Sequence, residues 1–502
     1  MNNLLIAIAV FVITVLGALF AVPHFIDWNS YRSAFEEEAR NVIGREVQVD
    51  GDVTLHLLPT PYFRVEKVRI ADTATPLTEH FFKADSLSIK LSIAPLLRGV
   101  VEVNEIELQR PVLRVAQDDK GAWNWQDFAQ ALSSTGYVPA NVTLSSLRIV
   151  NGVLALHGAD GTERTRLDGL NGELSAPALE GPYRFRGTFT SGGATREVRI
   201  ATASPEPDGK VPLRLSLRLL DSGASYVLDA RAIDLMGKTR VEGDLTARLP
   251  VAGPPPAAAQ RPSSRSDEEP RVDQGETPLE VKAKIKADAG GASFSDLTLT
   301  FELGDRPQIV TGTAQAFWRT PVTLDMNVSS RWLDLDRLAG AGEDAGPASS
   351  VAKLAGWVRD LLPGDGVARV GITIEQANLS GEVIGPLRLA LARSANRLEI
   401  GELRTSLPGG TQVDLKGEIS GAADALAYRG NIGVRGASTA RFAAWATGNA
   451  LAIAAEGDGP FDLKANIAVD PAGGIAVRDF AGTLAGTALK GSGGYKWRER
   501  PS

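Results

Sequence analysis

The stretch VPLRLSLRL, residues Val211–Leu219, has an aliphatic side chain at every second position, with Pro212 and then polar side chains between them. Successive side chains of a β-strand point to opposite faces, so the aliphatic residues would line one face and Arg214, Ser216 and Arg218 the other. Such a strand buries one face and leaves the other in water. This is typical of an antiparallel sheet and not of a parallel sheet covered on both faces.

The same alternation recurs along the chain, whereas helical patterns are sparse. Further strand patterns lie at Glu46–Leu58, Ser86–Ile93, Val281–Ala287, Val322–Val328 and Val370–Ile374. Short helices are predicted at Asn29–Ile43, Trp123–Leu132, Leu333–Ala339, Ala348–Leu362 and Thr439–Thr447. The 52 glycines among 502 residues suit many strands joined by turns. The sequence therefore predicts a mainly β fold, an antiparallel sheet with a few short helices.

Weak internal repeats point to an elongated arrangement of these strands. Phe294–Trp318 and Val477–Trp497 both read as a strand containing Asp, a Gly-Thr turn and a strand ending near Trp. Leu147–Leu156 (LRIVNGVLAL) is similar to Ile106–Val115 (IELQRPVLRV). Repeated units that pair with their neighbours predict a quasi-linear β structure in place of a closed globule.

An apolar segment, Leu4–Val22, carries no charge and is long enough for a helix to cross a hydrocarbon layer of ~30 Å. No basic residue precedes it and its cleavage site is poor, which favours a retained transmembrane anchor over a cleaved signal peptide. The flanking charges do not fix its orientation. The predicted organisation is an anchor over 1–23, a β domain over 24–250, a linker or long loop rich in Pro, Ser and charge over 251–279, and a second β-rich region with short helices over 280–502.

The helix predicted at Asn29–Ile43 is amphipathic. Asn29 or Ser30 is expected to cap its start, and Gly44 its end. Glu36–Glu38 would face water. The predicted apolar face carries Tyr31, Phe35, Ala39 and Val42.

Composition argues against catalysis and against nucleic acid. The net charge is −7 and no block of Lys and Arg is present, which excludes a basic nucleic-acid surface. The absence of cysteine excludes disulfides and thiolate chemistry. The four histidines lack metal-ligand spacing, and no nucleophile elbow or phosphate-binding loop occurs. We expect neither an enzyme nor a cofactor or metal. The histidines are His24, His56, His80 and His157.

The apolar strand faces are the remaining candidate site. They would be either the core of a β-sandwich or an open apolar trough that holds acyl chains, and alternation alone does not separate these two interpretations. The candidate lipid-binding residues are Leu87, Ile89, Leu91, Ile93, Val211, Leu213, Leu215, Leu217, Leu219, Val322, Leu324, Met326, Val328, Ile372 and Ile374.

An ordered series of turn-and-strand motifs resembles the AsmA family, well over residues 24–135 and loosely beyond. The motifs are Asp27-Trp28-Asn29-x-Tyr31-Arg32, Gly44-Arg45-x-Val47-x-Val49-x-Gly51, Leu58-Pro59-x-Pro61, Ile93-Ala94-Pro95-Leu96-Leu97-x-Gly99, Leu108-x-Arg110-Pro111, Gly121-x-x-Asn124-Trp125 and, far downstream, Leu407-Pro408-Gly409-Gly410-Thr411. Each motif alone is a common pattern, but their order is specific.

The resemblance implies a cell-envelope protein of Gram-negative bacteria. Such a protein is anchored in the inner membrane by one transmembrane helix, with an N-terminus in the cytoplasm and an elongated, curved β-groove in the periplasm. The implied role is phospholipid transport between the inner and outer membranes, with phospholipid as ligand and periplasmic or outer-membrane proteins as further partners. The alternative is a non-catalytic scaffold for outer-membrane assembly, which would use strand edges or the helix predicted at Ala348–Leu362 to hold protein partners.

Overall fold

The computed structural model divides into two compact units, Met1–Gly243 and Asp244–Ser502. It describes residues 26–56, 60–72, 80–92, 95, 103–116, 123–125, 144–158, 160–176, 181–234, 239–252, 276–301, 307–318, 321–340, 346–361, 366–394, 397–420, 427–447, 458–470 and 473–496. The predicted anchor, Leu4–Val22, lies outside the described residues. Within those residues, no helix has the length and apolar character needed to cross a membrane.

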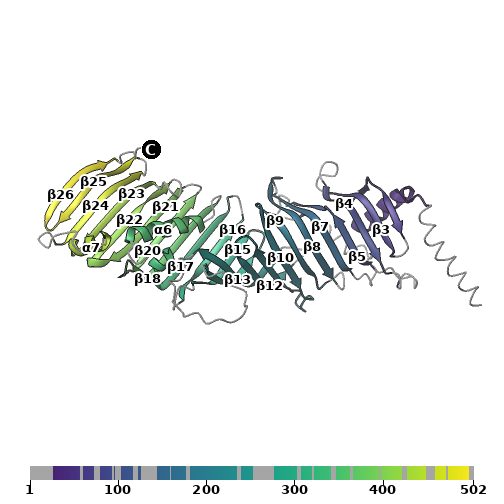
Figure 1. Cartoon of the computed structure of the whole chain (residues 1–502), viewed down its shortest axis with the longest axis horizontal. Coiled ribbons are helices and arrows are strands. Elements are labelled where there is room, and N and C mark those ends of the chain that lie inside the picture. The colour runs from purple at the N-terminus through teal and green to yellow at the C-terminus, as the bar shows by residue number, and fades with distance from the viewer. Residues whose placement is uncertain are drawn as a thin grey trace, which may run out of the picture. The chain divides into compact units, whose positions relative to one another are not determined.

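The first unit consists of a short helical segment followed by a sheet (Figure 1). The segment is the 3₁₀ turn η1 (Trp28–Tyr31) and helix α2 (Arg32–Ile43). The strands are β1 (Val47–Val49), β2 (Val53–His56), β3 (Tyr62–Ala71), β4 (His80–Leu91), β5 (Val103–Gln109), β6 (Val112–Ala116), β7 (Leu144–His157), β8 (Glu163–Ala176), β9 (Arg184–Ser191), β10 (Ala194–Thr202), β11 (Val211–Leu219) and β12 (Ser225–Ile233). Strand β13 (Arg240–Ala252) contains the division between the units.

The strands of the second unit likewise form a sheet, in which they follow one another in the order of the chain. The strands are β14 (Glu276–Ala287), β15 (Gly291–Phe301), β16 (Gln308–Phe317), β17 (Thr323–Asp334), β18 (Val367–Leu379), β19 (Glu382–Ile384), β20 (Leu387–Ser394), β21 (Arg397–Leu407), β22 (Thr411–Ser420), β23 (Ala427–Gly436), β24 (Phe461–Asp470), β25 (Gly474–Leu484) and β26 (Thr487–Tyr495). The helices are α5 (Leu335–Ala339), α6 (Pro347–Leu361) and α7 (Thr439–Thr447), and Pro408–Gly410 forms the turn η2.

The predicted mainly β class is confirmed, but the sheet is mixed and not purely antiparallel. Strand β7 pairs in parallel with both β5 and β6, and β18 pairs in parallel with β17. Parallel neighbours need a crossover connection, because a tight turn can only reverse the chain. Helices α5 and α6 lie in the connection between β17 and β18. Alternation within one strand carries no information on the direction of its neighbour, so the sequence could not reveal these pairs.

Helix α2 covers the start of the first sheet. Its side chains Phe35, Ala39 and Ile43, together with Trp28, pack on a core of β1–β3 and β4 residues. The ring centroids of Phe35 and Phe63 are 5.3 Å apart. This buried core consists of Val47, Val49, Val53, Val65, Val68, Ile70 and Phe81.

Three details of this helix differ from the predictions. Asp27, not Asn29 or Ser30, provides the cap, since its Oδ1 accepts from Asn29 N at 3.1 Å at the start of η1. Tyr31 is 58% exposed and does not belong to the packed face. Glu36 does not simply face water, because its Oε1 accepts a 2.7 Å hydrogen bond from Val49 N of β1. The C-cap is confirmed: Gly44 has φ 73° and donates to Arg40 O.

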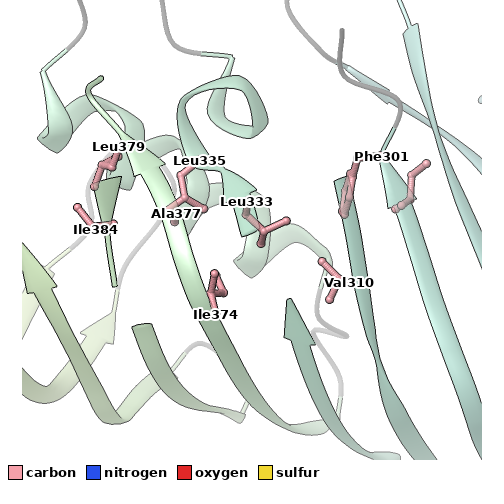
Figure 2. Packing of buried hydrophobic residues seen from close by; sticks show 9 residues of the cluster. Phe301, Val310, Leu333, Leu335, Ile374, Ala377, Leu379 and Ile384 are labelled. Atoms are coloured by element: carbon pink, nitrogen blue, oxygen red, sulfur yellow. The ribbon is translucent and has the colours of Figure 1, made fainter. Parts of the chain in front are cut away.

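In the second unit, the helices cover one end of the sheet face (Figure 2). Leu333, Leu335, Ile374 and Ala377 form part of a buried cluster beneath them, and Leu354 of α6 and Trp445 of α7 pack against that cluster. The predicted helix at Thr439–Thr447 is confirmed in its bounds. The helices predicted at Leu333–Ala339 and Ala348–Leu362 correspond to α5 and α6, and each begins and ends within two residues of its predicted bounds. Helix α5 begins later than predicted because Asp334 caps it in an extended conformation.

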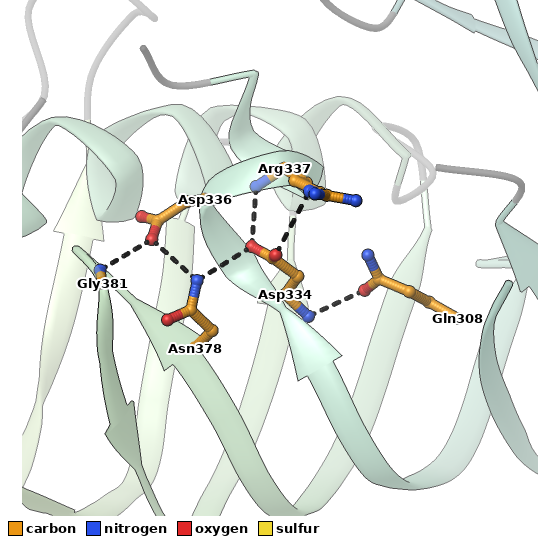
Figure 3. A network of polar contacts seen from close by, with 6 residues as sticks. All are labelled: Gln308, Asp334, Asp336, Arg337, Asn378 and Gly381. Atoms are coloured by element: carbon orange, nitrogen blue, oxygen red, sulfur yellow. Dashed lines mark hydrogen bonds and ion pairs between the residues drawn. The ribbon is translucent and has the colours of Figure 1, made fainter. Parts of the chain in front are cut away.

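A polar network holds α5 and α6 in place over this cluster (Figure 3). Asp334 accepts from Arg337 N at 3.1 Å and from Asn378 Nδ2 at 3.3 Å, while its own N–H donates to Gln308 Oε1 at 2.8 Å. Asp336 accepts from Ser350 Oγ of α6 at 2.9 Å. Its other oxygen lies 3.3 Å from Asn378 Nδ2. The network therefore connects β16, β17, α5, α6 and β18.

The predicted repeats have the same backbone geometry. Asp296 and Asp479 both have positive φ, 50° and 49°, at the register shift of β15 with β16 and of β25 with β26. Arg110 and Asn151 also have positive φ, 46° and 53°, at matching positions of the two similar decapeptides. Those decapeptides lie side by side in parallel, with Ile106 opposite Leu147.

Two further predicted segments, a linker and a helix, fall partly outside the described residues. Residues 251–252 and 276–279 of the linker predicted at 251–279 belong to strands, because β13 ends at Ala252 and β14 begins at Glu276. Residues 253–275, and residues 126–132 of the helix predicted at Trp123–Leu132, lie outside the described residues.

Candidate functional site

One row of apolar side chains crosses ten strands of the first unit. Each member is the direct partner of the next across a strand pair, so all ten lie on one face of the sheet. We name this row the apolar stripe: Leu55, Phe63, Ile89, Ile106, Leu147, Leu174, Phe185, Ile200, Leu215 and Leu228. It runs from β2 through β3, β4, β5 and β7 to β12, strands that follow one another in Figure 1.

Among the described residues, the stripe does not have the burial of a sandwich core. All ten side chains are half-buried, and none is fully buried as the centre of a closed core would be. At one end, α2 covers the stripe through Phe35 on Phe63. From β8 to β12, no helix that the structure describes makes extensive contact with the strands. The face is therefore closed at the helix end and open along its length, as far as the described residues show.

A second row on the same face lies beside the stripe. It includes Leu87, Leu108 and Ile149, then the glycine pair Gly172–Gly187, then Val198, Leu217 and Tyr226. The ring of the stripe residue Phe185 lies over the two glycines. The apolar surface is therefore continuous across the glycines, although they have no side chains of their own.

The second unit has a corresponding row, which we name the second stripe. It consists of Leu297, Gly312, Val328, Ile372, Leu389, Leu403, Leu415, Ile432 and Ala465. Beside it lies another glycine pair, Gly417–Gly430, covered by the ring of Tyr428. Burial raises the pKa of Tyr428, whose hydroxyl donates to Lys416 O at 3.2 Å.

Most of the predicted lipid-binding residues lie on the sheet faces that carry the apolar stripe and the second stripe, but they differ in their positions on those faces. Ile89 and Leu215 belong to the apolar stripe, and Val328 and Ile372 belong to the second stripe. Leu87, Leu91, Val211, Leu213, Leu217, Leu219, Leu324 and Met326 are half-buried in flanking positions.

Three predicted residues differ from the rest. Ile374 is 3% exposed in the cluster beneath the helices, so it is closed off from any ligand on the open face. Val322 is 41% exposed and precedes β17. Ile93 lies outside the described residues.

The opposite face of the first sheet is charged. Its central row contains Glu107, Arg148, Glu173, Arg186 and Arg199, each opposite the next. These residues alternate along their strands with members of the stripe, so they project away from it. The two faces of one sheet therefore offer contrasting surfaces, one apolar and one ionic.

The motif residues that suggested the family build turns and caps and do not line the stripe. A Cβ at Gly51 would lie 2.6 Å from Glu66 Cβ, so only glycine fits there. Gly409 and Gly410 have φ of 77° and 65° in the turn before β22, and Gly409 O accepts from Ala437 N. Pro61, Pro95 and Pro408 are buried and Trp125 packs near α2, whereas Pro59 and Gly99 lie outside the described residues.

One signal was missed in the sequence. The tripeptides Gly172-Glu173-Leu174 and Phe185-Arg186-Gly187 have counterparts in Gly417-Glu418-Ile419 and Tyr428-Arg429-Gly430. In both cases the two tripeptides pair with each other in the same register. A search for Gly-Glu-aliphatic followed about a dozen residues later by aromatic-Arg-Gly would have found the repeat.

Two of the histidines, His56 and His80, contact neighbouring side chains, and His24 lies outside the described residues. His56 stacks on Tyr62, with ring centroids 4.5 Å apart. His80 Nε2 lies 3.4 Å from Arg69 Nη1, and partial burial together with the charges of Arg69 and Lys83 lowers its pKa. Among the described residues, no group of three or more His, Asp or Glu side chains is arranged to hold a metal ion.

The fold and the site define a class of protein: a β-sheet protein whose sheet has one half-exposed apolar face and one charged face. Residues 1–229, just under half of the chain, match the model of the AsmA family. The predicted resemblance is thereby confirmed. No curated protein and no solved structure matches the chain.

Proposed function

We propose that this protein binds phospholipid acyl chains along the apolar stripe and supports lipid transport between the inner and outer membranes of the cell envelope. The observation that supports this proposal is the in-register run of ten half-buried apolar side chains on successive strands. The other face of the same sheet is ionic, so this run is the apolar surface that the sheet offers to a ligand. It fits a ligand that is apolar and elongated.

The length of the stripe suits acyl chains. Nine steps between strands at about 4.8 Å each give roughly 43 Å. One leaflet contributes only about half of the ~30 Å hydrocarbon core of a bilayer, so the stripe is longer than a single chain needs. Each methylene removed from water is worth about 0.8 kcal/mol, so contact with the stripe lowers the cost of withdrawing a chain from a bilayer.

The proposed location of the protein is the one predicted from its sequence, the inner membrane and the periplasm. A transmembrane helix at Leu4–Val22 would anchor the chain in the inner membrane and leave the body in the periplasm. Helix α2 follows this segment closely in the sequence, so the closed end of the stripe is the end nearest the anchor in the chain. The role needs no catalytic group or cofactor, and direction would come from a lipid gradient or a protein partner.

Photo-crosslinking of the full chain in a Gram-negative host tests the proposal. A photoreactive amino acid at Leu215 should capture phospholipid, detectable by mass spectrometry of the crosslinked product. The matched control places the same group at Arg218, which is exposed on the other face of the same strand. Phospholipid captured equally at both positions, or at neither, would contradict lipid binding on the stripe. Capture of a protein at Leu215 in place of lipid would instead favour the scaffold hypothesis.

A further inference from the structure

The charged face of the first sheet contains a hollow of about 520 Å³ over β8–β11. Four guanidinium groups and one carboxylate line it, from Arg184, Arg186, Arg199, Arg214 and Glu173. Three adjacent strands supply the arginines, so the hollow is built by the sheet and not by one flexible loop. Its lining therefore has an excess of three positive charges.

The register creates an unfavourable contact in this hollow. Arg186 of β9 lies directly opposite Arg199 of β10. Like charges in directly opposite positions of two strands destabilise a sheet. Glu173 lies on the other side of Arg186 in the register, but its Oε1 accepts a 2.9 Å hydrogen bond from Ser146 Oγ.

The arginines differ in how they are neutralised. Arg199 contacts Glu197 at 2.5 Å, and Arg214 Nε lies 3.4 Å from Asp229. The side chains of Arg184 and Arg186 make no ion pair or hydrogen bond with any residue that the structure describes. Two guanidinium groups, two residues apart on one strand, therefore point into the hollow without an anion.

We propose that this hollow binds a phosphate group through Arg184 and Arg186, assisted by Arg199. The planar guanidinium presents parallel N–H donors that match phosphate oxygens in a bidentate way, and a bound anion would offset the repulsion between Arg186 and Arg199. The phosphate is either free or part of a phospholipid headgroup. Arg184 and Arg186 flank Phe185, so the site lies on the face opposite the apolar stripe and does not depend on acyl-chain binding there.

The test measures the melting temperature of the full chain, purified in detergent, while inorganic phosphate is titrated at constant ionic strength with chloride. Phosphate stabilises many proteins by exclusion from their surface, so the informative signal is a rise that saturates. Arg184→Gln/Arg186→Gln should raise the half-saturating phosphate concentration at least about tenfold, because two charge-assisted contacts are lost. The control Arg148→Gln/Arg218→Gln removes equal charge from the same face outside the hollow and should leave the midpoint unchanged.

A second variant keeps the proposal testable if the Gln pair does not fold. Arg184→Lys/Arg186→Lys retains the charge but not the bidentate geometry, and should still lose most of the saturable rise in melting temperature.

Repeating the titration with monomeric dihexanoyl phosphatidylglycerol distinguishes the two sources of phosphate. A response to this lipid identifies a headgroup, and a response to inorganic phosphate alone identifies free phosphate. Absence of a saturable rise in the unmodified chain, or equal midpoints in all variants, would overturn the proposal. Neither result would affect lipid capture at Leu215.

Discussion

The ring of Phe185 lies over Gly172 of the neighbouring strand, and a Cβ built at Gly172 would come within 2.7 Å of the ring atom Cζ. The ring of Tyr428 lies over Gly417 in the same way, and a Cβ built at Gly417 would lie 2.8 Å from the ring atom Cε2. Both glycines sit in the middle of strands, where glycine is normally unfavourable. The aromatic side chain occupies the space that the missing side chain leaves.

This relation predicts that Gly172→Ala destabilises the protein. The added methyl group must displace the ring or the backbone, since Arg186 O would also lie only 2.9 Å away. Overpacking of this kind should cost about 1–3 kcal/mol. Chemical denaturation of the full chain provides the measurement, and Gly417→Ala should behave alike.

The control for this prediction is Gly433→Ala. Gly433 also lies in a strand, β23, but the nearest atom to its built Cβ is 3.9 Å away. The free energy of unfolding should change by less than about 0.5 kcal/mol there. Equal effects at Gly172 and Gly433 would show that the ring contact is not what requires glycine.

A second prediction concerns the attachment of helix α2. Glu36→Ala removes the acceptor of the 2.7 Å bond from Val49 N and leaves a part-buried backbone N–H unpaired. We expect a loss of about 1–3 kcal/mol in the free energy of unfolding of the first unit. Glu37→Ala alters an exposed neighbour on the same helix and should have no measurable effect. A similar loss for both variants would mean that helix charge, not the bond to β1, is responsible.

A third prediction concerns the network beneath α5. Asp334→Ala removes the N-cap of α5 and one of the acceptors of Asn378, and so loosens the helices over the second sheet. Loss of a cap alone typically costs about 0.5–2 kcal/mol, and the side chain of Asp334 is only 11% exposed, which adds to the cost.

Hydrogen exchange of the amides in α5 and α6 is the direct readout for Asp334→Ala, because faster exchange there marks loosened helices. Asp325→Ala serves as comparison. Its partner Arg369 is exposed, and such surface pairs contribute little. Unchanged exchange in α5 and α6 of Asp334→Ala would argue that packing alone positions the helices.

A fourth prediction follows from His80. Partial burial and the cations Arg69 and Lys83 lower the pKa of His80 below 6.5, against a smaller opposing effect of Asp50. The unfolded chain therefore binds a proton here more readily than the folded one, and stability falls as the pH drops below about 6.5. The stability is fully present above that pH. His80→Gln should flatten the dependence of melting temperature on pH between 7.5 and 5.5, whereas an unchanged slope would assign it to other groups.

Much of the local structure followed from the sequence. Alternation located β11 over Val211–Leu219, and turn chemistry located the C-cap at Gly44. These features depend on neighbours a few residues away, which the chain itself specifies. The ordered motifs likewise indicated the AsmA family, since they are the turns and caps that the fold needs.

The composition of the apolar stripe was only partly predictable. Ile89 and Leu215 were recognised as members of apolar strand faces, but nothing in the sequence connects them to Phe185 or Leu228. Which residues meet across a strand pair depends on register, and a slip of one residue would exchange the two faces. The bulge at Asn151, which has positive φ and lies at a register shift between β7 and β8, is part of what sets that register.

The sequence by itself determined which residues are apolar on each strand, the bounds of β11 and α7, and the resemblance to the AsmA family. Only the tertiary structure decided that ten strands align their apolar residues into one stripe, that α2 closes one end of it, and that Arg186 faces Arg199 on the reverse side. Alternation and capping arise from contacts within a few residues. Alignment arises from contacts between distant strands, where bulges, parallel pairs and buried hydrogen bonds such as Glu36 to Val49 fix the partners.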